Sequence, residues 1–269
     1  MAETIAIEIR DGDDVYRFAA PRSWNDMSRK QLFGWCGVLD GFLDRDDALN
    51  TAVLMFYNMP DDLFARLPEP MLYHLRETLS YLEEVNLTKN VIGTLWILGR
   101  RYYGPGNRLA NISIAEYRRT EIYYQLYQKT KRREFLLLLA ATLYRPRGGK
   151  DPDDPRRGID ERSIQRRADF FRWAMHRNTL RSILLFYEGC RQEIIRKHPK
   201  VYPKMSIDVD NGPFAKRENK EIIDMEDHIL AFAGGKLGNY AETAKCNVYL
   251  FLKNKEHRIE EVEALKNKK

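Results

Sequence analysis

Arginine side chains concentrate in one part of this chain, around a break between two helical patterns. The apolar run at 135–143 (FLLLLAATL) ends directly before Tyr144, Arg145, Pro146 and Arg147, and Arg156 and Arg157 follow. Arg166, Arg167 and Trp173 come next, within a second helical pattern. The planar guanidinium group suits bidentate contacts with carboxylates and phosphates. Because arginine, tyrosine and tryptophan also dominate binding energies at protein interfaces, we expect these nine residues to bind a partner.

The break itself is rich in residues that interrupt regular structure. Three prolines and three glycines lie between Pro146 and Gly158, so we expect an exposed loop at 144–160. Ordered surface loops often carry function. An alternative interpretation is a solvated excursion in which Asp151, Asp153 and Asp154 neutralise the arginines.

Residue patterns typical of catalytic or metal sites are weak throughout. The histidines at 74, 176, 198, 228 and 257 lack the spacing of zinc ligands. The glycine-rich stretch 234–238 lacks the spacing of a phosphate-binding loop. Asp208 and Asp210 begin a stretch that resembles a calcium loop, but its glycine and its twelfth residue are out of register. We therefore expect no cofactor, no metal and no enzymatic activity; an enzyme with scattered catalytic residues is the least favoured alternative.

The charge is unevenly distributed along the chain. Residues 100–200 hold 24 Lys and Arg against 11 Asp and Glu, a surplus of +13, whereas residues 1–99 hold 9 against 16, or −7. A basic segment favours an acidic partner, either a protein or a nucleic acid. Pairing within the chain, with the remaining charge solvated, is an equally open interpretation.

Size and composition indicate a globular protein. The chain has 269 residues, of which 43% are hydrophobic and 31% charged. Its longest apolar run, at 135–143, is far shorter than the about 20 residues that cross a membrane. The first residues lack the features of a signal peptide, and three widely spaced cysteines do not form a disulfide framework. We therefore expect a cytoplasmic protein without a membrane partner.

The elements that must position these residues are mostly helices. Alternating isoleucines at 5, 7 and 9, a turn and a second strand-like run predict an N-terminal β-hairpin at 1–22. Apolar residues at helical spacing predict a multi-helix body at 23–204, in which Ser113 and Glu116 match a capping box and 91–98 fits either a strand or a buried helical turn. A linker at 205–219 and a C-terminal helical pair at 220–269, a helix-loop-helix, complete a mainly α fold.

Several short stretches resemble phage and prophage virion-morphogenesis proteins of the tail-assembly-chaperone kind. They are Tyr103-Gly104-Pro105 with residues 109–117, Leu143-Tyr144-Arg145-Pro146 at the end of an apolar helix, residues 229–238, and residues 247–252. The order of a short β N-terminus, a helical body and a helix-loop-helix end is also similar. The resemblance spans most of the chain.

This resemblance implies a non-enzymatic protein-binding factor that keeps tape-measure or tail-tube subunits competent for assembly in the bacterial host cytoplasm. The alternative from composition is a nucleic-acid-binding protein that uses the basic segment 100–200. Basic residues interleaved with aromatic residues can bind phosphates and stack on bases.

Overall fold

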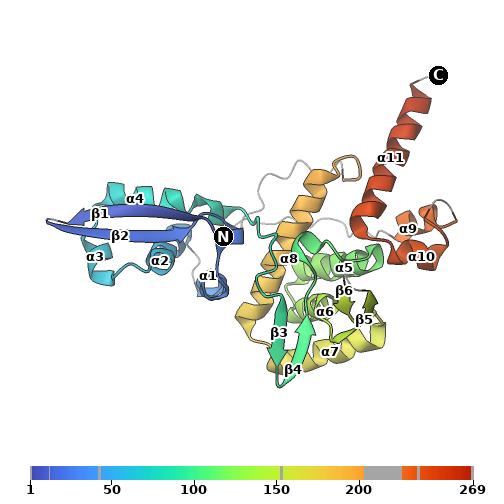
Figure 1. Ribbon diagram of the computed structural model, residues 1–269, viewed down its shortest axis with the longest axis horizontal. Coiled ribbons are helices and arrows are strands. Elements are labelled where there is room, and N and C mark those ends of the chain that lie inside the picture. Colours follow the sequence, from blue (N-terminus) through green and yellow to red (C-terminus); the bar gives the residue numbers. More distant parts are fainter. Residues whose placement is uncertain are drawn as a thin grey trace. The chain divides into compact units, whose positions relative to one another are not determined.

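The fold is mainly α-helical, as the sequence predicts, and begins with a β-hairpin (Figure 1). The computed structural model describes residues 2–11, 13–41, 44–151, 154–202, 226–234 and 237–267. The predicted linker at 205–219 lies outside the described residues. Each sheet among the described residues has two strands: β1-β2, β3-β4 and β5-β6.

The chain forms two compact units. The first contains residues 1–91 and returns for 177–189, and the second contains 92–176 and most of the chain after 190. The predicted hairpin segment, 1–22, therefore belongs to the same unit as the helices that follow it. The predicted body, 23–204, is divided near Val91 and again within one long helix.

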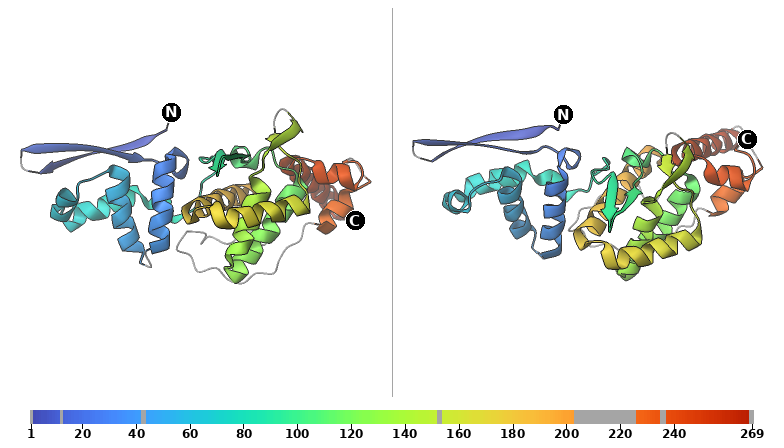
Figure 2. Two further views of the ribbon diagram at one scale, coloured as in Figure 1. Left: turned by 90° about the horizontal axis from the view of Figure 1, so that it is seen from below. Right: turned by 60° about the horizontal axis from the view of Figure 1, so that its bottom comes forward.

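The first unit places the N-terminal hairpin against short helices. Strands β1 (Thr4–Asp11) and β2 (Asp14–Pro21) pair antiparallel in continuous register, from Thr4 opposite Pro21 to Asp11 opposite Asp14. Figure 2 shows this ribbon lying along one side of the helices. The helices are α1 (Arg29–Gly41), α2 (Arg45–Tyr57), α3 (Asp61–Arg66) and α4 (Glu69–Thr78), with 3-10 turns at Trp24–Asp26 and Ser80–Glu83.

Local sequence explains where these helices begin and end. The Asp44 carboxylate accepts hydrogen bonds from the backbone N–H groups of Asp46 and Asp47 at the start of α2. Asn58 adopts a left-handed conformation at the other end of α2, which asparagine tolerates better than most residues. The buried Trp24 indole donates to the carbonyls of Tyr81 and Glu84, at 2.8 and 2.7 Å, and so ties the first 3-10 turn to the second.

The second unit contains the arginine-rich segment. Its strands are β3 (Thr94–Ile97), β4 (Arg100–Tyr103), β5 (Arg147–Asp151) and β6 (Asp154–Arg156). Its central helices are α5 (Ile114–Thr130), α6 (Arg133–Leu143) and α7 (Glu161–Ala174). The long helix α8 (Arg177–Lys197) contributes residues to both units.

The C-terminal part holds more helices than the predicted pair. Helices α9 (Glu226–Phe232), α10 (Tyr240–Lys245) and α11 (Val248–Lys266) follow one another among the described residues. The expected second helix is split at Cys246 and Asn247, because the Asn247 side chain accepts from the N–H of Tyr249 and starts a new helix. Asn239 and Glu242 form a complete capping box at the start of α10, which was not predicted from the sequence.

Two predictions in the second unit are resolved by the structure. The stretch 91–98, which fitted either a strand or a buried helical turn, contains strand β3. The stretch 144–160 is not a loop throughout, because β5 and β6 form an irregular antiparallel hairpin within it. Arg147 lies opposite Arg156 in that hairpin.

Candidate partner-binding surface

The nine predicted partner-binding residues fall into two groups. Four of them are buried, and their predicted exposure is wrong: Tyr144, Arg145, Arg156 and Arg167. Pro146 is half-buried, and the remaining four are exposed: Arg147, Arg157, Arg166 and Trp173.

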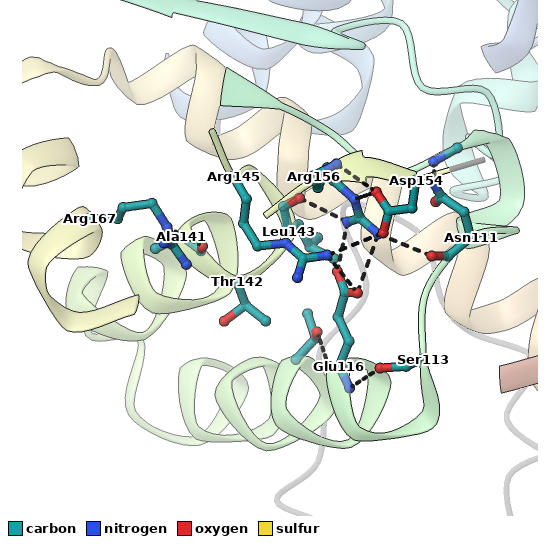
Figure 3. Close-up of polar contacts among 12 residues, drawn as sticks. Asn111, Ser113, Glu116, Ala141, Thr142, Leu143, Arg145, Asp154, Arg156 and Arg167 are labelled. Atoms are coloured by element: carbon teal, nitrogen blue, oxygen red, sulfur yellow. Dashed lines mark hydrogen bonds and ion pairs between the residues drawn. The ribbon is translucent and has the colours of Figure 1, made fainter. Parts of the chain in front are cut away.

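Two of the three buried arginines, Arg145 and Arg156, contact the carboxylate of Glu116, which lies in the first turn of α5 (Figure 3). The Arg156 guanidinium donates to Glu116 Oε1 at 2.7 Å, and the Arg145 guanidinium donates to Glu116 Oε2 at 3.0 Å. Asp154 accepts a second pair of bonds from Arg156, at 2.7 and 2.9 Å, and lies 3.5 Å from Arg145. Two carboxylates thus face two guanidinium groups, so these four charges balance.

Arg156 and Arg167 also bond to the end of helix α6. The last carbonyls of a helix lack partners within it and carry partial negative charge. Arg156 donates to Leu143 O at 3.0 Å, and Arg167 donates from Nε to Ala141 O at 3.0 Å. Arg156 further reaches Asn111 O at 3.2 Å. Arginine therefore joins α5, α6, β6 and α7 (Figure 3).

The predicted capping box at Ser113 forms only in part. The Ser113 hydroxyl accepts from the N–H of Glu116 at 3.2 Å, as a helix N-cap should. The Glu116 side chain, however, turns to the two arginines. Its charge is needed there, because an unpaired guanidinium is costly to bury.

Burial and the neighbouring charges shift the pKa of Glu116 in opposite directions. Burial raises the pKa of Glu116, while the guanidinium groups of Arg156 and Arg145 act to lower it. Burial, together with the charge of Arg145, lowers the pKa of Arg167 to about 10. Arg167 therefore stays charged at neutral pH. The ordered charges of this buried cluster hold the β5–β6 hairpin against the helices.

A different surface of the second unit exposes large side chains. In the β3–β4 hairpin, Leu95, Ile97 and Tyr102 are buried, whereas Trp96 and Arg101 lie opposite each other and are exposed. The Arg101 guanidinium lies over the Trp96 ring, 4.1 Å from its centroid. Leu98, at the turn, is 78% exposed.

Helix α7 adds aromatic residues beside this hairpin. The turn of β3–β4 lies near the C-terminal end of α7 in Figures 1 and 2. There the Arg100 guanidinium lies 5.1 Å from the centroid of the Phe170 ring. Trp173 follows Phe170 at helical spacing and is 89% exposed. We use the name Trp–Arg surface for the residues of the β3–β4 hairpin and of the end of α7 that carry these contacts. They are Trp96 and Arg101 on the outer face of the hairpin, Leu98 at its turn, Arg100 and Phe170 on the side toward α7, and Trp173.

The chemistry of the Trp–Arg surface is that of a binding site for another macromolecule. Exposed tryptophan contributes a large apolar area with few rotatable bonds, and tryptophan and arginine are enriched among residues that dominate binding energy. Only Trp173 of this surface was predicted. Trp96 could have been found from the alternation of Leu95, Trp96 and Ile97, which puts the tryptophan on the face opposite two apolar residues.

Neither a metal cluster nor a spanning helix occurs in the part of the chain that the structure describes. No group of three or more His, Cys, Asp or Glu residues in that part could hold a metal ion. No helix there has both the length and the apolar character needed to cross a membrane.

In comparisons with known proteins, no family model, curated protein or solved structure matches this chain.

Proposed function

We propose that this chain is a non-enzymatic binding factor that recognises a partner protein through the Trp–Arg surface. The observation that carries this proposal is the exposure of Trp173 and Trp96, at 89% and 62%, with the Arg101 guanidinium stacked on the Trp96 ring. Tryptophan and arginine are enriched among the residues that dominate binding energy at protein interfaces. A partner that buries the indole rings and places carboxylates beside the guanidinium groups would match both the apolar and the charged side chains of this surface.

The proposed partner is a structural protein of a phage or prophage tail. Support for this partner comes from the sequence resemblance to tail-assembly chaperones. Tape-measure and tail-tube subunits both need protection before assembly, and an apolar surface with a charged rim suits that task. The proposed site of action is the bacterial host cytoplasm.

Nucleic acid is the second candidate, and the basic surplus of residues 100–200 favours it. Much of that charge is nevertheless paired within the protein. Besides the Glu116 cluster, the paired arginines of this segment include Arg118 with Glu226, Arg119 with Glu161, Arg181 with Asp40 and Arg191 with Glu121. Less charge is thus available for phosphates than the composition suggests.

The test is co-expression with the tail proteins encoded by neighbouring genes, followed by affinity purification and a measured dissociation constant. We expect Trp173→Ala and Trp96→Ala each to weaken binding by about 30-fold, since truncating a central interface residue costs about 2 kcal/mol or more. Charge reversal at Arg100 and Arg101 should also weaken binding.

The matched control is Tyr73→Ala in helix α4. Tyr73 is 61% exposed, but it lies in the first unit, away from the Trp–Arg surface in the sequence. Its replacement should leave binding unchanged. Failure to retain any tail protein contradicts the proposed partner. Equal effects of Tyr73→Ala and Trp173→Ala contradict the proposed surface.

Measuring the affinity for single-stranded DNA or RNA distinguishes the nucleic-acid-binding function from the protein-binding function. Counterion release makes nucleic-acid affinity fall steeply with salt. Tight, salt-sensitive binding that is lost in Trp173→Ala, with no tail protein retained, would favour the nucleic-acid function over the protein-binding one.

A further inference from the structure

Strand β1 has one unpaired edge. Among the described residues it pairs only with β2. The N–H of Arg22 donates to Glu3 O at 3.1 Å, just beyond the last register pair, Thr4 with Pro21. Because hydrogen-bonded and non-hydrogen-bonded pairs alternate, the backbone groups of Thr4, Ala6, Glu8 and Arg10 point away from β2. Pro21, which lacks an N–H, lies opposite Thr4, in agreement with this alternation.

The side chains along that edge are open to solvent. Thr4, Ala6, Glu8 and Arg10 are all exposed. On the other face of the strand, Ile9 is buried, but Ile5 and Ile7 are only half-buried. An unpaired strand edge is a template for another strand. The hairpin would therefore gain from a further strand beside β1.

The sequence of β1 suits pairing with the same strand of a second copy of the chain. We propose that β1 pairs antiparallel with β1 of a second copy of this chain, in a register centred on Ile7. Ala6 then exchanges backbone hydrogen bonds with Glu8 of the second copy, and Thr4 exchanges them with Arg10. The result is a four-stranded sheet with a two-fold axis, in which each copy contributes the same surface.

Side-chain pairing supports this register. Ile7 lies beside Ile7 of the second copy, and Ile5 lies beside its Ile9, so the isoleucines of the two copies form one continuous apolar face. The exposed Glu8 lies opposite Ala6, and Arg10 lies opposite Thr4, so like charges are never directly opposed. Centring the pair on Glu8 would place two carboxylates opposite each other, and centring it on Ala6 would shorten the paired segment.

The outer edge of β2 is less suitable. Its outward backbone groups belong to Val15, Arg17 and Ala19, and Pro21 removes a donor at one end. A symmetric pairing centred on Arg17 would set two guanidinium groups opposite each other, which destabilises a sheet. The contact is therefore assigned to β1.

Two alanines provide a matched pair of variants. Ala6 and Ala19 are cross-strand partners within the hairpin, and both are exposed. Both have N–H groups that point to an outer edge, so proline at either position spares the bonds between β1 and β2. Only Ala6→Pro removes a donor from the proposed contact.

Sedimentation equilibrium of the full chain over a range of concentrations measures the outcome. We expect the wild type and Ala19→Pro to form dimers, and Ala6→Pro to raise the dimer dissociation constant by about tenfold or more. Circular dichroism checks that both variants fold. A wild type that stays monomeric throughout, or equal dissociation constants for the two variants, would overturn the proposal.

Cross-linking tests the register without a proline. In a Cys246→Ser background, Ile7→Cys places two thiols across the two-fold axis, with Cα atoms about 4.5 Å apart in a non-hydrogen-bonded pair, within disulfide range. In Glu8→Cys the two positions are diagonal, at about 7–8 Å, and too far apart. Mild oxidation should give a covalent dimer for Ile7→Cys and little for Glu8→Cys. The reverse result, or equal yields, would contradict the register.

Discussion

The carboxylate of Glu116 holds together segments that lie far apart in the sequence. It bonds to Arg145, 29 residues away, and to Arg156, 40 residues away, and all three side chains are buried. Ion pairs of this kind gain attraction from low dielectric but lose hydration. Their contribution is therefore best judged by removing one charge and leaving the others in place.

We expect Glu116→Gln to be strongly destabilising. Glutamine keeps the shape of the side chain but removes the charge, so two buried guanidinium groups lose a carboxylate. Breaking a buried pair in this way costs about 3–5 kcal/mol. Urea denaturation should show a corresponding fall in the free energy of unfolding.

Glu134→Gln is the control for this prediction. Glu134 lies near the start of α6 and pairs with Arg132 at 3.3 Å, with both side chains largely open to solvent. Exposed pairs contribute at most about 1 kcal/mol, so the free energy of unfolding should hardly change. Equal losses from the two variants would show that the buried cluster contributes no more than a surface pair.

Which arginines are exposed could not be predicted from the sequence. Arg145 and Arg147 flank the same proline and look alike in the sequence, yet Arg145 is buried and Arg147 is exposed. The difference depends on the carboxylates of Glu116 and Asp154, which only the fold brings near Arg145. Trp173, by contrast, lies outside the apolar stripe of α7, so its exposure agrees with the helical pattern of the sequence.

At the scale of elements, periodicity predicted most of the fold. The N-terminal hairpin and the apolar helix 135–143 are confirmed, because alternation and helical spacing are local properties. The hairpin of β5 and β6 was missed, since prolines and glycines normally indicate a loop. Pro155 is nevertheless accommodated in β6, a strand of three residues in an irregular pair.

Gly189 in helix α8 lies against the backbone of Leu87, and this close approach can be tested. An added Cβ would lie 2.6 Å from the backbone nitrogen of Leu87 and would also overlap the carbonyl of Leu87. Backbone cannot move aside as a flexible side chain can. We expect Gly189→Ala to destabilise the protein by about 1–3 kcal/mol, measured as a lower midpoint of urea denaturation.

Gly41→Ala serves as the comparison, because Gly41 is also helical. It ends α1, and an added Cβ there would meet nothing within 4 Å. Alanine favours helix over glycine by up to about 1 kcal/mol, so stability should be unchanged or slightly higher. A Gly189→Ala variant as stable as Gly41→Ala would show that α8 and the Leu87 backbone can separate without cost.

At the scale of the whole molecule, the two units share one continuous helix. Residues 177–189 of α8 belong to the first unit, and the remainder of α8 belongs to the second. Its buried side chains continue through the division, including Tyr187 and Cys190. The sequence pattern predicted helices throughout the body 23–204 but could not show where the units divide, because a division depends on contacts with distant residues.

Cysteine reactivity can report whether the units unfold together. Cys36 lies in the first unit and Cys190 in the second, and both are fully buried. Burial raises the pKa of Cys36 to about 11 and also raises the pKa of Cys190, so neither forms the reactive thiolate readily in the folded protein. Cys246, which is half-buried, should react first with a thiol reagent.

We expect Cys36 and Cys190 to become reactive at the same urea concentration. Loss of α8 from one unit also removes buried residues from the other, so the transition should be cooperative across the chain. Quantitative labelling at a series of urea concentrations, followed by peptide mass spectrometry, gives a midpoint for each cysteine. Midpoints that differ clearly would mean that the helix can fray at the division near Gly189 while one unit stays folded.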